Sequence, residues 1–222
     1  MSILQPPQST GSTPTSKAES LVPRPPEEPL ASPLDHAHPL KADRYFAMIA
    51  TGVLGKKDRV YLWKGRLVEK MTKGRPHVFA VGSLYETLFT LTPAGWYVEQ
   101  EQPLMIGDES VPEPDLMIVR GTRRDHVQKP PSAADLALLV EVADSSLAED
   151  LGDVLQTYAA HSIPTYWVVN LRARRVEVYR DPTGPVEKPF YRTAHLYGPN
   201  DEVPVEIDGR EVGRIAVASI LP

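Results

Sequence analysis

Two carboxylates stand at positions where an apolar strand ordinarily has none. Glu141 interrupts LALLVEV, a run apolar enough for burial on both faces of a sheet, and Asp115 begins the apolar run DLMIV after two prolines. A buried, unpaired carboxylate is costly, so each acid needs a cation, hydrogen bonds or a raised pKa. If the strands are neighbours, both acids can converge at one sheet edge as hard oxygen ligands for Mg²⁺ or Mn²⁺. A purely structural pair, in which arginine or histidine satisfies the acid, is the competing interpretation.

The elements that would position these acids follow from apolar periodicity and turn residues. Helices are expected over 42–54, from 76 to about 93, and from 146 to about 161, where SLAE has the form of a capping box. Strands are expected in VYLWKGRLVEKM as a hairpin, and in WYVEQEQPLMI, VPEPDLMIV, LALLVEV, PTYWVVN, RVEVYR and the segments around Asp208-Gly209 up to IAVASILP. This order favours an α/β (α+β) domain with a mixed central sheet flanked by helices, an N-terminal hairpin and short C-terminal strands.

Composition sets the boundaries of that domain. Nine of the 23 prolines lie in residues 1–40 without apolar periodicity, so we expect 1–38 to be a disordered Pro/Ser-rich tail and 39–222 to be one domain. A role of the tail in docking a protein partner is the alternative interpretation. The whole chain carries a net charge of −5, which argues against a broad cationic face.

Other classes of protein are excluded by simple absences. With no cysteine in 222 residues, the chain has no disulfide, thiolate metal site or cysteine nucleophile. GVLGKK lacks the spacing of a phosphate-binding loop, and neither GxSxG nor HExxH occurs. No apolar run is long enough to span a membrane, and no secretory signal is visible, so a cytoplasmic protein without membrane contact is expected.

The order of several segments resembles the Uma-type restriction endonuclease family, a branch of the PD-(D/E)XK nuclease superfamily. The resemblance covers about residues 40–222. The resemblance lies in the segments VYLWKGRLVEKM, Pro76-His77, EPDLMIV, EVADSSLAED, Tyr158-Ala159, IPTYWVVN, VEVYRDP and the ending DGREVGRIAVASILP. Membership implies a restriction endonuclease-like core and a metal-dependent DNA endonuclease.

The same resemblance implies roles for individual residues. Asp115 matches the Asp of the PD motif, and Glu141 matches the second acid, so together they would hold Mg²⁺ or Mn²⁺ beside a DNA phosphate. His77 matches a histidine common in the family and would touch the site, unless it is an ordinary residue at a helix start. Weaker matches are the polar loop and the acid that follow Glu141, namely Asp144, Ser145, Ser146 and Asp150.

This chain departs from the family pattern at the position that matters most for turnover. The plain motif has lysine two residues after Glu141, where this chain has Ala143, and the family moves that lysine to the next helix, where this chain has Val154. Tyr61 replaces a usual Glu, and Leu151 replaces an arginine. The resemblance therefore implies an impaired endonuclease. The alternative is a catalytically inactive DNA-binding or dimerisation module that keeps the fold. By analogy with the superfamily we expect a homodimer.

Two basic strips are candidates for DNA contact. Arg120, Arg123 and Arg124 follow the Asp115 strand, and we expect them where a phosphate would approach the metal. A second strip consists of Arg172, Arg174 and Arg175. Solvated loop charges are the alternative interpretation of both strips.

Overall fold

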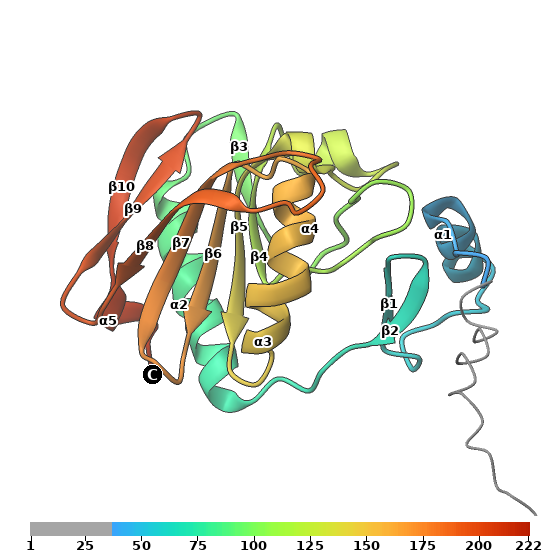
Figure 1. The fold of residues 1–222 in the computed structure, drawn as a ribbon, viewed down its shortest axis with the longest axis horizontal. Helices are drawn as coiled ribbons and strands as arrows, with labels where there is room; N and C mark the ends of the chain where they lie inside the picture. The colour runs from blue at the N-terminus through green and yellow to red at the C-terminus, as the bar shows by residue number, and fades with distance from the viewer. Residues whose placement is uncertain (1–36) are drawn as a thin grey trace, which may run out of the picture. The chain divides into compact units, whose positions relative to one another are not determined.

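The computed structural model describes residues 37–222, so the predicted disordered tail lies almost wholly outside the described residues. The centre is a six-stranded sheet in the order β3-β4-β5-β6-β7-β8 (Figure 1). Only β5 and β6 are parallel, and the other neighbours are antiparallel. The predicted mixed sheet is therefore confirmed. The strands are β3 (Trp96–Gln100), β4 (Leu116–Arg120), β5 (Leu136–Ala143), β6 (Thr165–Asn170), β7 (Arg175–Pro182) and β8 (Tyr191–Tyr197).

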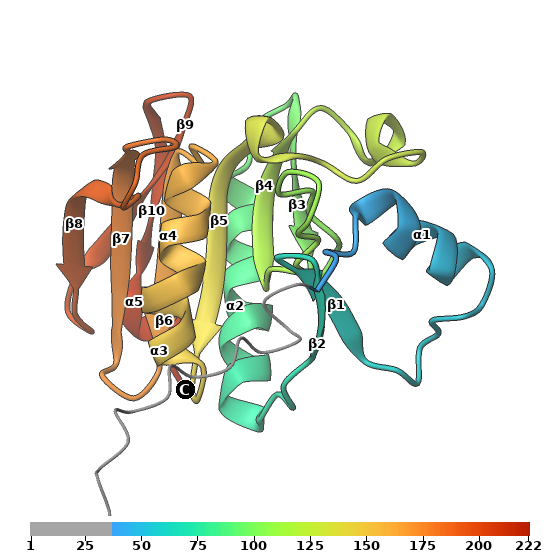
Figure 2. The same ribbon diagram turned by 45° about the vertical axis from the view of Figure 1, so that its right-hand side comes forward.

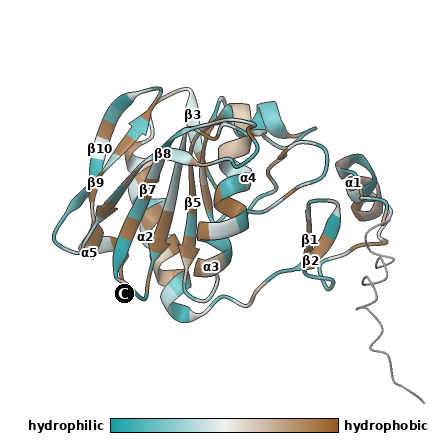
Figure 3. Cartoon of the chain, viewed as in Figure 1, coloured by the Kyte–Doolittle hydropathy of each residue, from teal (hydrophilic) through white to brown (hydrophobic). Residues whose placement is uncertain are grey.

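The sheet is covered on both faces, as Figure 2 shows. One face packs against α2 (Arg75–Leu91), the ribbon of β9 (Glu202–Ile207) and β10 (Arg210–Ala216), and α5 (Val217–Ile220). The other face packs against the segment of α3 (Leu147–Glu149), the π-helical turn η4 (Asp150–Val154) and α4 (Leu155–Ala160). Burial on both faces explains why seven of the eight β5 residues are buried and why the central strands are so apolar (Figure 3).

The register of β4 and β5 determines where the two acids meet. Leu116 pairs with Val140 in the antiparallel ladder, so one further step brings Asp115 opposite Glu141. Residues opposite each other on antiparallel strands project to the same face. Asp115 therefore stands directly before β4 and Glu141 near the end of β5, at one end of the sheet.

A smaller unit of the fold precedes α2 in the chain. The hairpin of β1 (Val60–Trp63) and β2 (Arg66–Glu69) and the helix α1 (Ala42–Ala50) share a cluster of buried residues, namely Ala42, Tyr45, Leu62 and Val111. The hairpin turn has positive φ at Lys64 (48°) and Gly65 (74°), the type I′ geometry that suits the twist of two strands. The predicted hairpin is thus confirmed, as is the one at Asp208-Gly209, with φ of 50° and 72°.

Three local expectations were wrong in detail. The first helix ends at Ala50 rather than near residue 54, the third helix is interrupted by the π-helical turn η4, and the predicted final strand becomes the short helix α5. The interruption occurs at Gly152, whose φ of −104° and ψ of −106° are not helical. The basic loop after β4 contains two short 3₁₀ turns, η2 (Arg123–His126) and η3 (Ala133–Asp135). Across residues 37–222, none of the helices has the length and apolar character needed to cross a membrane.

The two type I′ turns allow a matched test of hairpin packing. Gly65→Ala and Gly209→Ala both place a side chain at positive φ, a strain of about 1–2 kcal/mol. A Cβ on Gly65 would clash with the Pro39 Cβ, whereas nothing lies within 4 Å of one on Gly209. We therefore expect Gly65→Ala to lower the melting temperature more than Gly209→Ala in thermal denaturation. Equal losses would show that Pro39 does not pack on the hairpin.

Candidate metal-binding and nucleolytic site

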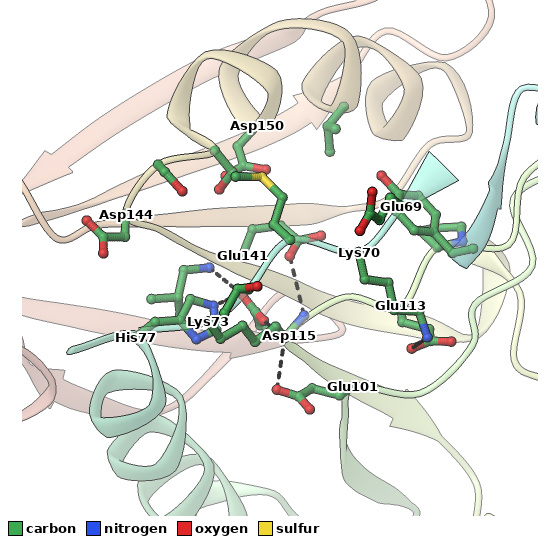
Figure 4. Close-up of a pocket in the computed structure, with 18 of the residues that line it drawn as sticks. Glu69, Lys70, Lys73, His77, Glu101, Glu113, Asp115, Glu141, Asp144 and Asp150 are labelled. Carbon is green, nitrogen blue, oxygen red and sulfur yellow. Dashed lines mark hydrogen bonds and ion pairs between the residues drawn. The ribbon is translucent and has the colours of Figure 1, made fainter. Parts of the chain in front are cut away.

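A cavity of about 490 Å³ opens where Asp115 and Glu141 meet. Its walls come from five parts of the chain: the β1–β2 hairpin and the linker after it, the start of α2, the ends of β3 and β5, the segment from Pro112 to Asp115 before β4, and the segment from Asp144 to Tyr158. Ten of its polar residues are labelled in Figure 4: Glu69, Lys70, Lys73, His77, Glu101, Glu113, Asp115, Glu141, Asp144 and Asp150. Seven of these ten are acids, and they outnumber the three basic residues of the lining, Arg59, Lys70 and Lys73, so the cavity has an excess of acidic groups.

Asp115 is almost completely buried, with an exposed fraction of 5%. Its Oδ2 accepts hydrogen bonds from the Val142 backbone N–H at 2.7 Å and from His77 Nε2 at 3.1 Å, and Lys73 Nζ lies 2.7 Å from Oδ1. Burial raises the pKa of Asp115, but the His77 hydrogen bond and the Lys73 charge outweigh burial and lower its pKa below the ordinary value. Asp115 is therefore an ionised acid held by three donors.

Glu141 is in the opposite electrostatic situation. Its Oε1 accepts a hydrogen bond from the Tyr158 hydroxyl at 3.0 Å, and its Oε2 accepts the Asp115 backbone N–H at 3.3 Å. Burial, together with the negative charges of Asp115 and Asp150, raises the pKa of Glu141 well above its ordinary value. Two adjacent acids with pKa values shifted in opposite directions are typical of a functional site.

Asp150 adds a third acid above Glu141 in Figure 4. Ser146 was expected to open a capping box, but its hydroxyl instead donates to Asp150 Oδ2 at 2.6 Å and makes no cap bond. Burial raises the pKa of Asp150 to about 6, an effect to which the charge of Asp115 also contributes. The π-helical turn begins at Asp150, and such turns often occur at functional sites.

Lys73 is a residue of the site that the sequence patterns did not single out. This residue lies in the linker between β2 and α2, and its ammonium bridges Asp115 and Glu101, with 2.8 Å to Glu101 Oε1. Burial lowers the pKa of Lys73, but the nearby acids outweigh burial, so its pKa is raised and it carries a positive charge. The available signal was a lysine four residues before His77, in a linker expected to meet the start of α2. This signal did not indicate that Lys73 would contact Asp115, which lies 42 positions further along the chain.

Two of the residues at which the chain departs from the family pattern line this cavity, whereas Ala143 and Leu151 do not. Val154 and Tyr61 both face it, as does His77, which is 7% exposed. Val154 also packs on the buried cluster between the sheet and α4. The residue at the expected lysine position therefore borders the acids and supplies no charge to them.

The basic strip after β4 lies elsewhere, and its expected position beside the metal site is wrong. Asp115 precedes β4 and Arg120 ends it, so five residue steps, about 17 Å of extended strand, separate them. Arg120 pairs with Asp208 at 2.6 Å, and Arg123 donates to the Val98 carbonyl at 2.6 Å. None of Arg120, Arg123 and Arg124 lines the cavity.

The second strip includes an arginine that does approach the site. Leu171 N–H donates to the Ala143 carbonyl at 3.0 Å, which joins the loop after β6 to the loop after β5. Arg172 of that loop lies 3.6 Å from Asp144, one of the residues that line the cavity, and its side chain is 71% exposed. Arg174 and Arg175 are instead bound to the Pro222 carbonyl and to Glu177.

The donor set fits a hard divalent cation. Within residues 37–222, no three His, Asp or Glu side chains already form a ligand group, so a cation would rest on Asp115 and Glu141, with water completing its shell. Carboxylate oxygens are the ligands that Mg²⁺ and Mn²⁺ prefer. Burial raises the pKa of Glu141, and repulsion from the nearby negative charges of Asp115 and Asp150 adds to this effect. A cation would relieve that repulsion.

Comparisons with known proteins identify a family and a similar fold. The family model described as "Uma2: Putative restriction endonuclease" matches residues 42–209, from α1 to the turn between β9 and β10. Among solved structures, the fold is similar to a "putative nuclease belonging to DUF820" from Anabaena variabilis ATCC 29413. That similarity has a TM-score of 0.60 and 12% sequence identity, and it covers 82% of this chain and 97% of the other. No curated protein matches the chain.

The opposite environments of Glu141 and Glu177 predict opposite effects of glutamine. A carboxyl with a raised folded-state pKa loses stability as pH rises above its ordinary value of 4.5, so Glu141→Gln should raise the melting temperature of the metal-free protein. This advantage should be small near pH 5 and grow towards pH 8. Thermal melts in a chelating buffer measure it.

Glu177→Gln is the matched control. Burial raises the pKa of Glu177, but hydrogen bonds from Asn170, Tyr179 and Arg175 outweigh burial and lower its pKa. Its carboxylate therefore contributes stability above pH 4.5 that is lost as pH falls through the folded-state pKa. We expect Glu177→Gln to lower the melting temperature at pH 8. A loss for both variants at pH 8 would contradict the assignment for Glu141.

Proposed function

Because this chain belongs to the Uma2 restriction endonuclease family, we propose that it is a metal-dependent DNA endonuclease that hydrolyses phosphodiester bonds at Asp115 and Glu141. One observation carries the proposal: two acids on adjacent antiparallel strands, with pKa values shifted in opposite directions, line one cavity beside a lysine ammonium. The family and the fold support nuclease chemistry at this point. The residue roles are our inference.

The chain's own contribution is to hold carboxylate oxygens in fixed directions. The Val142 N–H and His77 orient Asp115, while the Tyr158 hydroxyl orients Glu141. Such preorganised groups need no rearrangement during the reaction. A bound Mg²⁺ or Mn²⁺ would supply an activated water and neutralise charge on the phosphate. His77 would act as a positioning residue for Asp115.

Val154 makes us expect reduced cleavage. A charged group at this wall of the cavity would stabilise the extra negative charge of the transition state, and valine cannot do so. The second candidate, an inactive DNA-binding or dimerisation module, is favoured by the same observation. Metal-dependent turnover distinguishes the two.

Several finer properties remain our predictions. We expect DNA as the substrate and a cytoplasmic homodimer. Arg172 is the arginine best placed to meet a DNA backbone at the cavity's rim. DNA contact by Arg120, Arg123 and Arg124 would involve a surface at the other end of β4.

The metal site can be tested by Mn²⁺ titration calorimetry combined with plasmid cleavage. We expect the wild type to bind Mn²⁺ and to nick supercoiled DNA slowly, and both properties to be lost in Asp115→Asn and Glu141→Gln, which each remove a ligand charge. Glu109→Gln is the control, because Glu109 pairs with Lys41 and does not line the cavity. Unchanged Mn²⁺ binding by both site variants would refute the metal assignment.

Val154 can be tested by returning a cation to its position. Val154→Lys should increase metal-dependent cleavage by at least tenfold, and by at most the ~10²–10³-fold that one charged transition-state stabiliser is typically worth. The long lysine stem can cover the apolar surface that Val154 now covers. Val154→Met has a similar length without the charge and should give no increase. Robust cleavage by the wild type, unchanged in Val154→Lys, would argue against this role.

A further inference from the structure

The linker between β2 and α2 carries a cation to the centre of the acid cluster. Lys73 Nζ lies 2.7 Å from Asp115 Oδ1 and 2.8 Å from Glu101 Oε1, as the dashed lines in Figure 4 indicate. The linker is short, and α2 begins two residues later, with Pro76 in its first turn. Lys73 therefore stands at the entrance of the helix that also supplies His77.

The backbone around Glu101 supports this arrangement. Glu101 directly follows β3 and has a φ of 52°, a left-handed conformation that a residue with a Cβ adopts at a cost of about 1–2 kcal/mol. Its N–H donates to the carbonyls of Pro114 at 3.1 Å and Asp115 at 3.2 Å. The residue that shares Lys73 with Asp115 is thus fixed to the Asp115 backbone. Such strain persists where the surrounding structure holds it, often at functional sites.

Other lysines near the cavity are differently engaged. Lys70 lines it but pairs with Glu113 at 2.7 Å, and Lys64 pairs with Asp153 on the π-helical turn. Among the described ion pairs, Lys73 alone joins a lysine to either acid of the Asp115–Glu141 pair. Any phosphate that reaches these acids meets Glu101, Asp115, Glu141 and Asp150, so a facing cation is needed to offset their repulsion.

We propose that Lys73 is a catalytic residue of this site, whose ammonium contacts a non-bridging oxygen of the scissile phosphate and provides the positive charge that Val154 cannot. This assignment rests on the proposed nuclease function and deepens it. A water oxygen forms a bond to phosphorus and loses one proton to solvent. The bond from phosphorus to the leaving oxygen breaks, and that oxygen keeps the electron pair and takes a proton from solvent. Lys73 stays protonated and stabilises the added negative charge on the phosphate.

The shared contacts of Lys73 are a further reason to expect a low rate. Its ammonium is divided between Asp115 and Glu101 in this structure, so contact with a phosphate exchanges at least one of these partners. A lysine at position 154 that lacked such partners would contact the phosphate without first breaking an ion pair. Lys73 is accordingly a partial replacement for the missing charge.

The test compares Lys73→Met with Lys70→Met and Lys41→Met. Lys41 pairs with Glu109 outside the cavity, and its side chain is exposed to a similar degree, 43% against 36% for Lys73. Plasmid cleavage in Mn²⁺ gives kcat and KM, calorimetry gives Mn²⁺ affinity, and thermal melts report folding. We expect Lys73→Met to lower kcat by ~10²-fold while Mn²⁺ affinity stays equal or becomes tighter. Lys41→Met should be unchanged, and Lys70→Met should lose less than tenfold.

If Lys73→Met lowers the stability of the fold, a double variant separates that effect from the loss of positive charge. Val154→Lys added to Lys73→Met should restore cleavage by at least tenfold, because it returns a cation to the cavity from a different part of the chain. Cleavage by Lys73→Met within threefold of the wild type would overturn the role of Lys73 alone. An equal loss of cleavage in Lys70→Met would also overturn it. Loss of both Mn²⁺ binding and cleavage in Lys73→Met would overturn it as well, because that result would indicate a structural role for Lys73. A wild type without cleavage that depends on Asp115 would overturn the proposed function and this inference together.

Discussion

The antiparallel register between β4 and β5 is the constraint on which the candidate site depends. It places Asp115 opposite Glu141 at one end of the sheet, and the Asp115 N–H is itself a donor to Glu141 at 3.3 Å. A shift of one residue would turn one acid to the other face, where α2 and the β9–β10 ribbon pack. The apolar neighbours that hold this register are buried on both faces, so the acids cannot move independently of the core.

The acids gathered at that end of the sheet repel one another and lower the stability of the fold. Hydrogen bonds and ion pairs from the rest of the structure offset part of this loss. Asp115 is satisfied by a backbone N–H, a histidine and a lysine, whereas Glu141 has a hydroxyl and a distant N–H, and its pKa remains raised. This imbalance fits the metal site that we propose, because Asp115 is already ionised and a bound cation would favour ionisation of Glu141. It also makes the metal-free protein less stable than its core would allow, as is common where function and stability compete.

The hairpin and the π-helical turn form the walls of the cavity through a contact of their own. Trp63 donates its indole N–H to Asp153 at 2.8 Å, and Lys64 pairs with the same carboxylate. This contact joins the β1–β2 tip to the segment that carries Asp150 and Val154. The linker bearing Lys73 begins at the other end of the hairpin, so the position of that lysine depends on how the hairpin is docked. Sequence-distant parts of the chain thereby meet around the Asp115–Glu141 pair.

Local patterns in the sequence determined most of the elements and the two central acids. The apolar run around Glu141, the positive-φ turns at Lys64-Gly65 and Asp208-Gly209, and the periodicity of α2 all depend on near neighbours, so they are readable from the chain. Contacts between distant segments were not readable. Only the tertiary structure brought Lys73 to Asp115 and put Arg120 at the far end of its strand. It also turned Ser146 from a helix cap into a donor to Asp150. Those outcomes depend on strand direction and on the packing of loops against the sheet, which no local spacing specifies.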